Sequence, residues 1–211
     1  MNVRRIAWSI TGLLSLPAAA RGGPVTWEFV GEVTRVFDPD NLLDGEVVIG
    51  NPMEGTFTFE STTSDGNPSP TIGSYHNAVT GVDATVGVHS LEGPTVPNWN
   101  KINSIAVYDG TGPFPDAFDV FTAVDFLGQE FFIWRMLLSD ANGNLFVTDA
   151  LPMSPPDLEL VQTHFSIIDP TETIDVELGI DGNLTLLRLV PEPSAITLLS
   201  LGALACTRRR G

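Results

Sequence analysis

The residues of this sequence that could best support catalysis or metal binding are its carboxylates. Its histidines are poorly spaced for either role. His76, His89 and His164 are separated by 13 and 75 positions and form no HxH or HExxH motif, so zinc chemistry is not indicated. Ser74 lies two positions before His76, but no Gly-x-Ser-x-Gly motif is present, and adjacency in sequence does not build a catalytic triad. The sequence predicts no catalytic residue.

Two acidic loops carry side-chain oxygens at the short spacings used by calcium sites. The first begins like an EF-hand loop, but Leu42 occupies the place of its third ligand. In the second, the glycine falls where a hairpin turn would need it, and Asp and Asn are also the residues that turns favour. Calcium and turn formation therefore stay open as explanations, and no other cofactor is indicated. The candidate ligands are Asp38, Asp40, Asp44, Asp140, Asn142 and Asn144.

Carboxylate pairs and one tryptophan raise two carbohydrate-related alternatives. A glycosidase needs two carboxyl groups about 5 to 10 Å apart, and Asp119 with Asp125, or Glu28 with Glu32, could supply them. The competing explanation is that acids on the polar side of a strand simply face water. Trp99, in a Pro-Asn-Trp-Asn loop, is a candidate for stacking on a sugar.

The charge of the chain excludes polyanionic partners. Residues 24–190 contain four basic residues against 25 acidic ones, a formal charge of −21. A nucleic-acid or anionic-lipid surface would require a basic patch, so neither is expected to bind this region. Because the single cysteine is Cys206, residues 24–190 contain no disulfide and no thiolate nucleophile.

Hydrophobic alternation with a period of two dominates these residues and predicts strands. Residues 25–29 and 53–60 alternate most clearly, followed by 102–108, 118–126, 131–138, 158–168 and 174–178. Asp181-Gly182 and Asn142-Gly143 predict tight hairpin turns. With many strands and no amphipathic helix, the expected fold is all-β, an antiparallel β-sandwich that is jelly-roll-like.

The two ends of the chain have the composition of export and membrane segments. Residues 1–20 combine a basic start, an apolar run and the small residues Ala18 and Ala20, which predict a signal-peptide helix cleaved before Arg21. A short apolar run from 193 to 206 precedes Arg208, Arg209 and Arg210. These arginines predict a membrane stop behind a short transmembrane helix.

Between the sandwich and that apolar run stands Pro191-Glu192-Pro193, which must be extended because proline resists helix formation. This tripeptide, the apolar segment and the arginine end resemble the PEP-CTERM sorting signal of exported bacterial proteins. The resemblance covers about the last 21 residues. It implies recognition by exosortase, a membrane cysteine protease that cuts near the motif.

The expected organisation is a signal peptide (1–20), a β-sandwich domain (24–190) and a sorting signal (191–211). We expect a non-enzymatic protein, exported through the secretory pathway, held transiently at the inner membrane and then placed at the cell surface or in the extracellular matrix. Its expected partners are an exosortase-type protease and extracellular polysaccharide. The alternatives are a carbohydrate-binding module and a polysaccharide-active hydrolase.

Overall fold

The computed structural model describes residues 22–95, 102–110, 115–169 and 178–191. Within them the chain forms strands and one short 3-10 turn, with no α-helix. The strands, in chain order, are β1 (Pro24–Phe37), β2 (Pro52–Glu60), β3 (Ile72–Tyr75), β4 (Val79–Val86), β5 (His89–Gly93), β6 (Ser104–Tyr108), β7 (Asp116–Phe126), β8 (Gln129–Asp140), β9 (Gln162–Ile168) and β10 (Gly179–Leu189), and the turn η1 (Leu158–Leu160) precedes β9.

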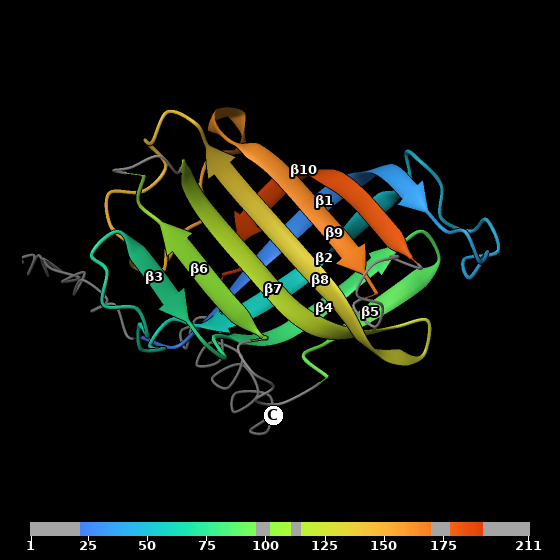
Figure 1. The fold of residues 1–211 in the computed structure, drawn as a ribbon, viewed down its shortest axis with the longest axis horizontal. Coiled ribbons are helices and arrows are strands. Elements are labelled where there is room, and N and C mark those ends of the chain that lie inside the picture. Colours follow the sequence, from blue (N-terminus) through green and yellow to red (C-terminus); the bar gives the residue numbers. More distant parts are fainter. Residues whose placement is uncertain (1–21, 96–101, 111–114, 170–177, 192–211) are drawn as a thin grey trace, which may run out of the picture.

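Eight of these strands close into an antiparallel barrel. Their order around the barrel is β7-β5-β4-β2-β1-β10-β9-β8, and β8 pairs again with β7 to complete the ring. The last link runs from Asp116 opposite Asp140 to Phe126 opposite Gln129. Figure 1 shows the strands crossing one another on the two walls of the barrel.

The two remaining strands extend one wall. β5 pairs only with the last part of β7, where Leu91 faces Phe126, whereas β6 pairs with the first half of β7 and β3 pairs with β6. The free edge of β3 is covered by the preceding loop, because Asp65 accepts the Ser74 N–H and Gly66 donates to the Ser74 carbonyl. The sheet therefore keeps its last edge from pairing with another chain.

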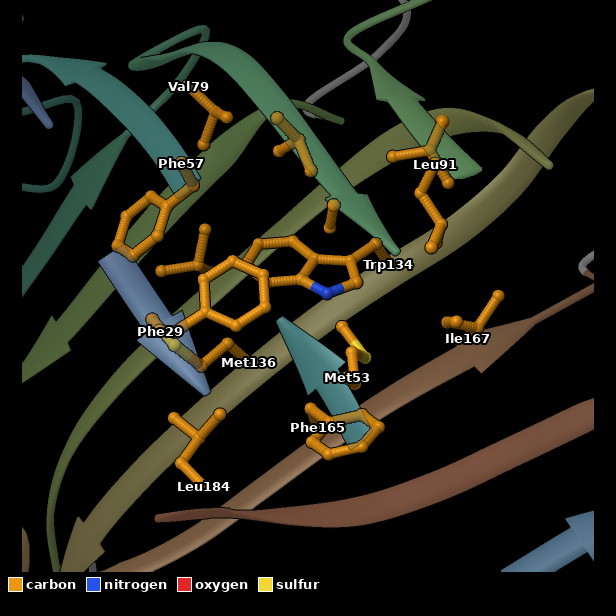
Figure 2. Packing of buried hydrophobic residues seen from close by; sticks show 14 of the residues in the cluster. Phe29, Met53, Phe57, Val79, Leu91, Trp134, Met136, Phe165, Ile167 and Leu184 are labelled. Carbon is orange, nitrogen blue, oxygen red and sulfur yellow. The ribbon is translucent and has the colours of Figure 1, made fainter. Parts of the chain in front are cut away.

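Aromatic side chains fill the barrel interior. Trp134 packs against Phe29 and Phe57, with ring centroids 5.4 and 5.8 Å away, and Figure 2 shows its indole beside the Phe29 ring. Trp27 makes edge contacts with Phe57 and Phe59. All of these rings are fully buried, and they fill the centre of the eight-stranded barrel.

The predicted jelly-roll-like sandwich is wrong, although the expectation of an all-β antiparallel fold is confirmed. The pairing of β7 with β8, and of β8 with β9, joins the two walls into one closed sheet. A half-buried strand has the same period of two in a sandwich and in a barrel, so the alternation could not distinguish them.

Neither predicted hairpin forms at its expected position. Asp181 and Gly182 lie inside the continuous strand β10, where they pair with β1 and β9. Asn142-Gly143 follows β8, but residues 141–157 form a loop without a strand. No hairpin therefore forms at this turn. A tight hairpin instead joins β7 to β8 at Leu127-Gly128, whose φ angles of 57° and 71° are those of a type I′ turn.

Among the residues that the structure describes, no helix is long and apolar enough to cross a membrane. The helices expected at the two ends of the chain fall on residues 1–20 and on residues after Pro191, which lie outside the described residues. The predicted strand at 174–178 is also outside them, apart from Leu178, which is fully buried.

Candidate functional site

The first strand of the barrel begins beside the end of its last strand. Trp27, near the start of β1, pairs with Leu189, the last residue of β10. The Val190 N–H then donates to the Thr26 carbonyl at 2.9 Å. We call this end of the barrel the tail end. The opposite end, with the loop 38–51 and the turns 87–88 and 127–128, is the far end, at the right of Figure 1.

Polar contacts fasten both chain ends to the wall. The Arg188 guanidinium donates two hydrogen bonds of 2.8 Å to the Glu28 carboxylate, which ties β10 to β1. Gly23 is held by Ser61, whose backbone N–H and hydroxyl both donate to the Gly23 carbonyl at 3.1 and 2.8 Å. A bidentate arginine–carboxylate pair is the strongest form of such a contact, so the junction is fixed up to Val190.

The structure places one residue of the predicted sorting motif. Pro191 is exposed and directly follows Val190, which bonds to β1. The other predicted residues of the chain ends, Ala18, Ala20, Glu192, Pro193, Arg208, Arg209 and Arg210, lie outside the described residues, as does the ligand candidate Trp99.

The first calcium candidate is a folded loop. The two carboxylate oxygens of Asp38 accept the backbone N–H groups of Leu42 and Leu43 at 2.7 and 2.9 Å. Asp44 accepts from the Asn41 amide at 3.0 Å. These contacts direct N–H donors at the oxygens that a cation would need, and Asp40 is exposed without joining them in a metal-binding group among the described residues.

The second calcium candidate is likewise used for turn formation. Asp140 accepts the Asn142 N–H at 2.8 Å and the Asn144 N–H at 3.0 Å. These bonds favour the charged carboxylate and lower the pKa of Asp140 below its usual value, against the opposing effect of burial. Asn144 directs its amide to the Asn142 carbonyl at 3.2 Å. The explanation by turn chemistry fits both loops.

Calcium should therefore leave the stability of the barrel unchanged. We expect the same melting temperature in millimolar calcium and in EDTA, because the oxygens of Asp38 and Asp140 already accept backbone N–H groups. Differential scanning calorimetry at fixed ionic strength measures this. Magnesium at the same concentration controls for salt effects, and a rise specific to calcium would show that one of the loops rearranges around the ion.

Neither predicted carboxylate pair has the separation that glycoside hydrolysis needs. Asp119 and Asp125 are six positions apart on β7, a distance of about 20 Å along an extended strand. Glu28 and Glu32 are four positions apart on β1, or about 13 Å. Asp119 is also held by Arg135 through two hydrogen bonds of 2.8 Å, and this pairing raises the pKa of Arg135 above its usual value, against the opposing effect of its partial burial.

A row of adjacent acids that no sequence pattern predicts lies on the outer wall. Asp83 on β4 faces Glu92 on β5, and Glu92 faces Asp125 on β7. Residues directly opposite each other in antiparallel strands have Cβ atoms about 5 Å apart, so the three carboxylates stand side by side. Shallow hollows of about 380 and 500 Å³ lie along this row, and both include Glu92 and Asp125. Only the strand register brings these acids together.

The serine and histidine that are near each other in sequence do meet in the structure. Ser74 lies in β3 and His76 in the turn that directly follows it, with Oγ 3.5 Å from Nε2, and the other ring nitrogen lies 3.3 Å from the Ser104 hydroxyl. They line a pocket of about 400 Å³ between the 61–71 loop and β6. Both ring nitrogens of His76 face hydroxyl groups. In a hydrolytic triad, by contrast, a carboxylate stabilises the imidazolium, so this arrangement differs from a triad.

The other two histidines lie apart from this pocket. The Nε2 atom of His89 is 3.3 Å from Glu46 at the far end, and that of His164 is 3.7 Å from Asp181 on the outer wall. The three histidines thus lie in separate parts of the fold.

Comparison of the chain with models of known protein families, with curated proteins and with solved structures found no match.

Proposed function

We propose that this chain is a non-enzymatic exported protein that is sorted to the cell surface or extracellular matrix through its C-terminal signal. The proposal begins from the tripartite end of the sequence, with Pro191-Glu192-Pro193, an apolar segment and three arginines, together with the predicted signal peptide. The protein that reads this signal would be an exosortase-type membrane protease.

The observation that carries the proposal is where the fold ends. Among the residues that the structure describes, the Val190 N–H makes the last backbone bond to β1, and Pro191 is exposed immediately after it. A protease needs an extended, accessible segment, and a cut after Val190 would keep every barrel hydrogen bond described within residues 22–190. The body therefore stays folded whether or not the signal is attached.

The position of the two ends adds a geometric consequence. Because β1 begins and β10 ends at the tail end, the chain runs from this end of the barrel toward both predicted processing points. β10 has 11 residues, which places the far end about 35 Å away along that strand. A chain tethered by its C-terminal segment would hold its far end away from the membrane.

The sorting signal can be tested by replacing Pro191, Glu192 and Pro193 with alanine in an exosortase-bearing host. We expect processing to stop and the protein to stay in the membrane fraction, because alanine removes both the extended conformation and the carboxylate. Intact mass spectrometry of the wild-type protein gives the mature termini, and cell fractionation follows the variant.

The matched control replaces Pro68 and Pro70, an exposed Pro-Ser-Pro strip in the 61–71 loop. That variant should be processed like the wild type. An unchanged mature C-terminus in the alanine variant of residues 191–193 would refute the sorting proposal, whereas failure of both variants would point to a general effect on folding.

A further inference from the structure

The far end of the barrel presents aliphatic side chains to solvent. Val48 and Ile49, in the loop between β1 and β2, are 52% and 68% exposed, and Val88, in the turn between β4 and β5, is 72% exposed. We refer to these three residues as the apolar tip. Single exposed aliphatic residues are common on proteins, but a group supported by its own folded loop is typical of a binding surface.

Hydrogen bonds and buried anchors fix the loop that carries the tip. Leu43 and Val47 are fully or nearly buried and attach the loop to the core. The Asn51 side chain accepts the Val48 N–H at 2.7 Å, while the Asn51 N–H donates to the Val48 carbonyl at 3.0 Å. Gly50 donates to Val33 of β1 at 2.8 Å. The exposed side chains are thus held in place before any partner arrives, which lowers the entropic cost of binding.

The two loops of the tip touch each other. Gly87 has a φ of 59°, and its N–H donates to Pro52 at 3.3 Å. A Cβ atom on Gly87 would lie 2.9 Å from the Glu46 carbonyl and 3.5 Å from a methyl group of Val47. Since this turn sits directly on residues 46–47, Val88 stands next to the loop that exposes Val48 and Ile49.

The loop that carries Val48 and Ile49 is acidic, and this charge selects the partner of the tip. Residues 38–51 contain Asp38, Asp40, Asp44 and Glu46 and no basic residue. Two such surfaces would repel each other across a self-associated pair, and an anionic membrane or polyanion would be repelled as well. Lys or Arg beside an apolar residue would instead meet complementary charge.

We propose that the apolar tip docks a polypeptide segment in which aliphatic side chains are flanked by lysine or arginine. The aliphatic groups would cover Val48, Ile49 and Val88, and the cations would lie over the acids of the 38–51 loop. Docking does not depend on the sorting signal, because every residue involved lies in the barrel. The sorting proposal and this one can therefore fail separately.

A titration with short synthetic peptides tests the docking surface on the mature protein. The probe is the peptide KLKLK, followed through the backbone amide signals of the isotope-labelled protein. We expect shifts concentrated at residues 46–51 and 87–88. The Kd should rise about tenfold or more in the double variant Ile49→Ser with Val88→Ser, since two aliphatic side chains would no longer leave water on binding.

Matched controls separate apolar docking from general charge attraction. Val147 is 92% exposed and lies at the tail end, so Val147→Ser should bind the peptide like the wild type. The peptides KSKSK and ELELE should bind at least tenfold more weakly than KLKLK. Equal binding of KLKLK and KSKSK, or unchanged binding by the double variant, would overturn the proposal.

The other possible occupants give different results. Analytical ultracentrifugation of the wild-type protein would reveal a dimer lost in Ile49→Ser if the tip covers a second copy. Co-sedimentation with phosphatidylcholine vesicles, lost in the same variant, would reveal a lipid surface. Either result, without peptide binding, would replace the polypeptide partner proposed above.

Discussion

Replacing Asp116 with alanine is expected to lower the free energy of unfolding by about 3 to 5 kcal/mol, because it leaves three backbone donors without an acceptor. Asp116 is fully buried at the start of β7. Its carboxylate accepts N–H groups from Leu145 at 2.7 Å, from Phe146 at 2.9 Å and from Gly110. One side chain thus connects the barrel to two loops at the tail end.

Asp116→Asn should lose less than Asp116→Ala, since the amide keeps one acceptor oxygen but turns an NH₂ group toward a donor. The control is Asp83→Ala, an exposed acid on the outer wall, which we expect to change stability by about 0.5 kcal/mol or less. Urea denaturation monitored by tryptophan fluorescence measures all three variants. A loss below about 1 kcal/mol for Asp116→Ala would mean that water replaces the carboxylate.

The strands could be predicted from the sequence because burial alternates along them. In β1 the buried residues Val25, Trp27 and Phe29 alternate with half-buried polar ones, which is the pattern of a strand with one face on the core. β1 is longer than the predicted strand, since it continues to Phe37 through register shifts near Gly31 and Val33. Such shifts leave no trace in a two-residue period.

The arrangement of the strands could not be predicted in the same way. Whether β8 returns to β7 is decided by twist and by side-chain packing across the barrel, which involve residues far apart in the chain. The sequence does not predict the hairpin at Leu127-Gly128, because leucine is unusual at a positive φ, whereas the composition of Asp181-Gly182 predicts a turn inside a continuous strand. Turn residues inside a strand mark close contacts there instead.

The same limit applies to the candidate sites. The row of Asp83, Glu92 and Asp125 spans 42 positions in sequence and exists only through the register of three strands. The apolar tip likewise combines loops about 40 positions apart. By contrast, the proposed sorting motif is a contiguous segment whose recognition would require no fold, so sequence alone is sufficient to propose it.

A large packing effect is expected at Gly182, where a methyl group has no space. Gly182 lies in β10 opposite Phe165 of β9. A Cβ atom there would stand 2.1 Å from the Phe165 ring and 2.3 Å from the backbone carbonyl of Glu32 in β1. Gly31 on β1 faces the same ring, with a Cβ position 2.7 Å from it. The fully buried phenylalanine thus covers two glycines where β1, β10 and β9 approach closely.

We therefore expect Gly182→Ala to destabilise the barrel by about 3 kcal/mol, at the upper end of the usual cost of overpacking. The ring could move, but the Glu32 carbonyl belongs to β1, whose pairing with β10 would have to shift with it. Gly23→Ala is the matched control, because a Cβ atom at Gly23 would meet nothing within 4 Å. Thermal unfolding of both variants gives the comparison, and adding Phe165→Leu should recover only part of the loss. Full recovery would mean that the Phe165 ring alone limits the space at Gly182. Partial recovery is expected because the β1 backbone, at the Glu32 carbonyl, also limits that space.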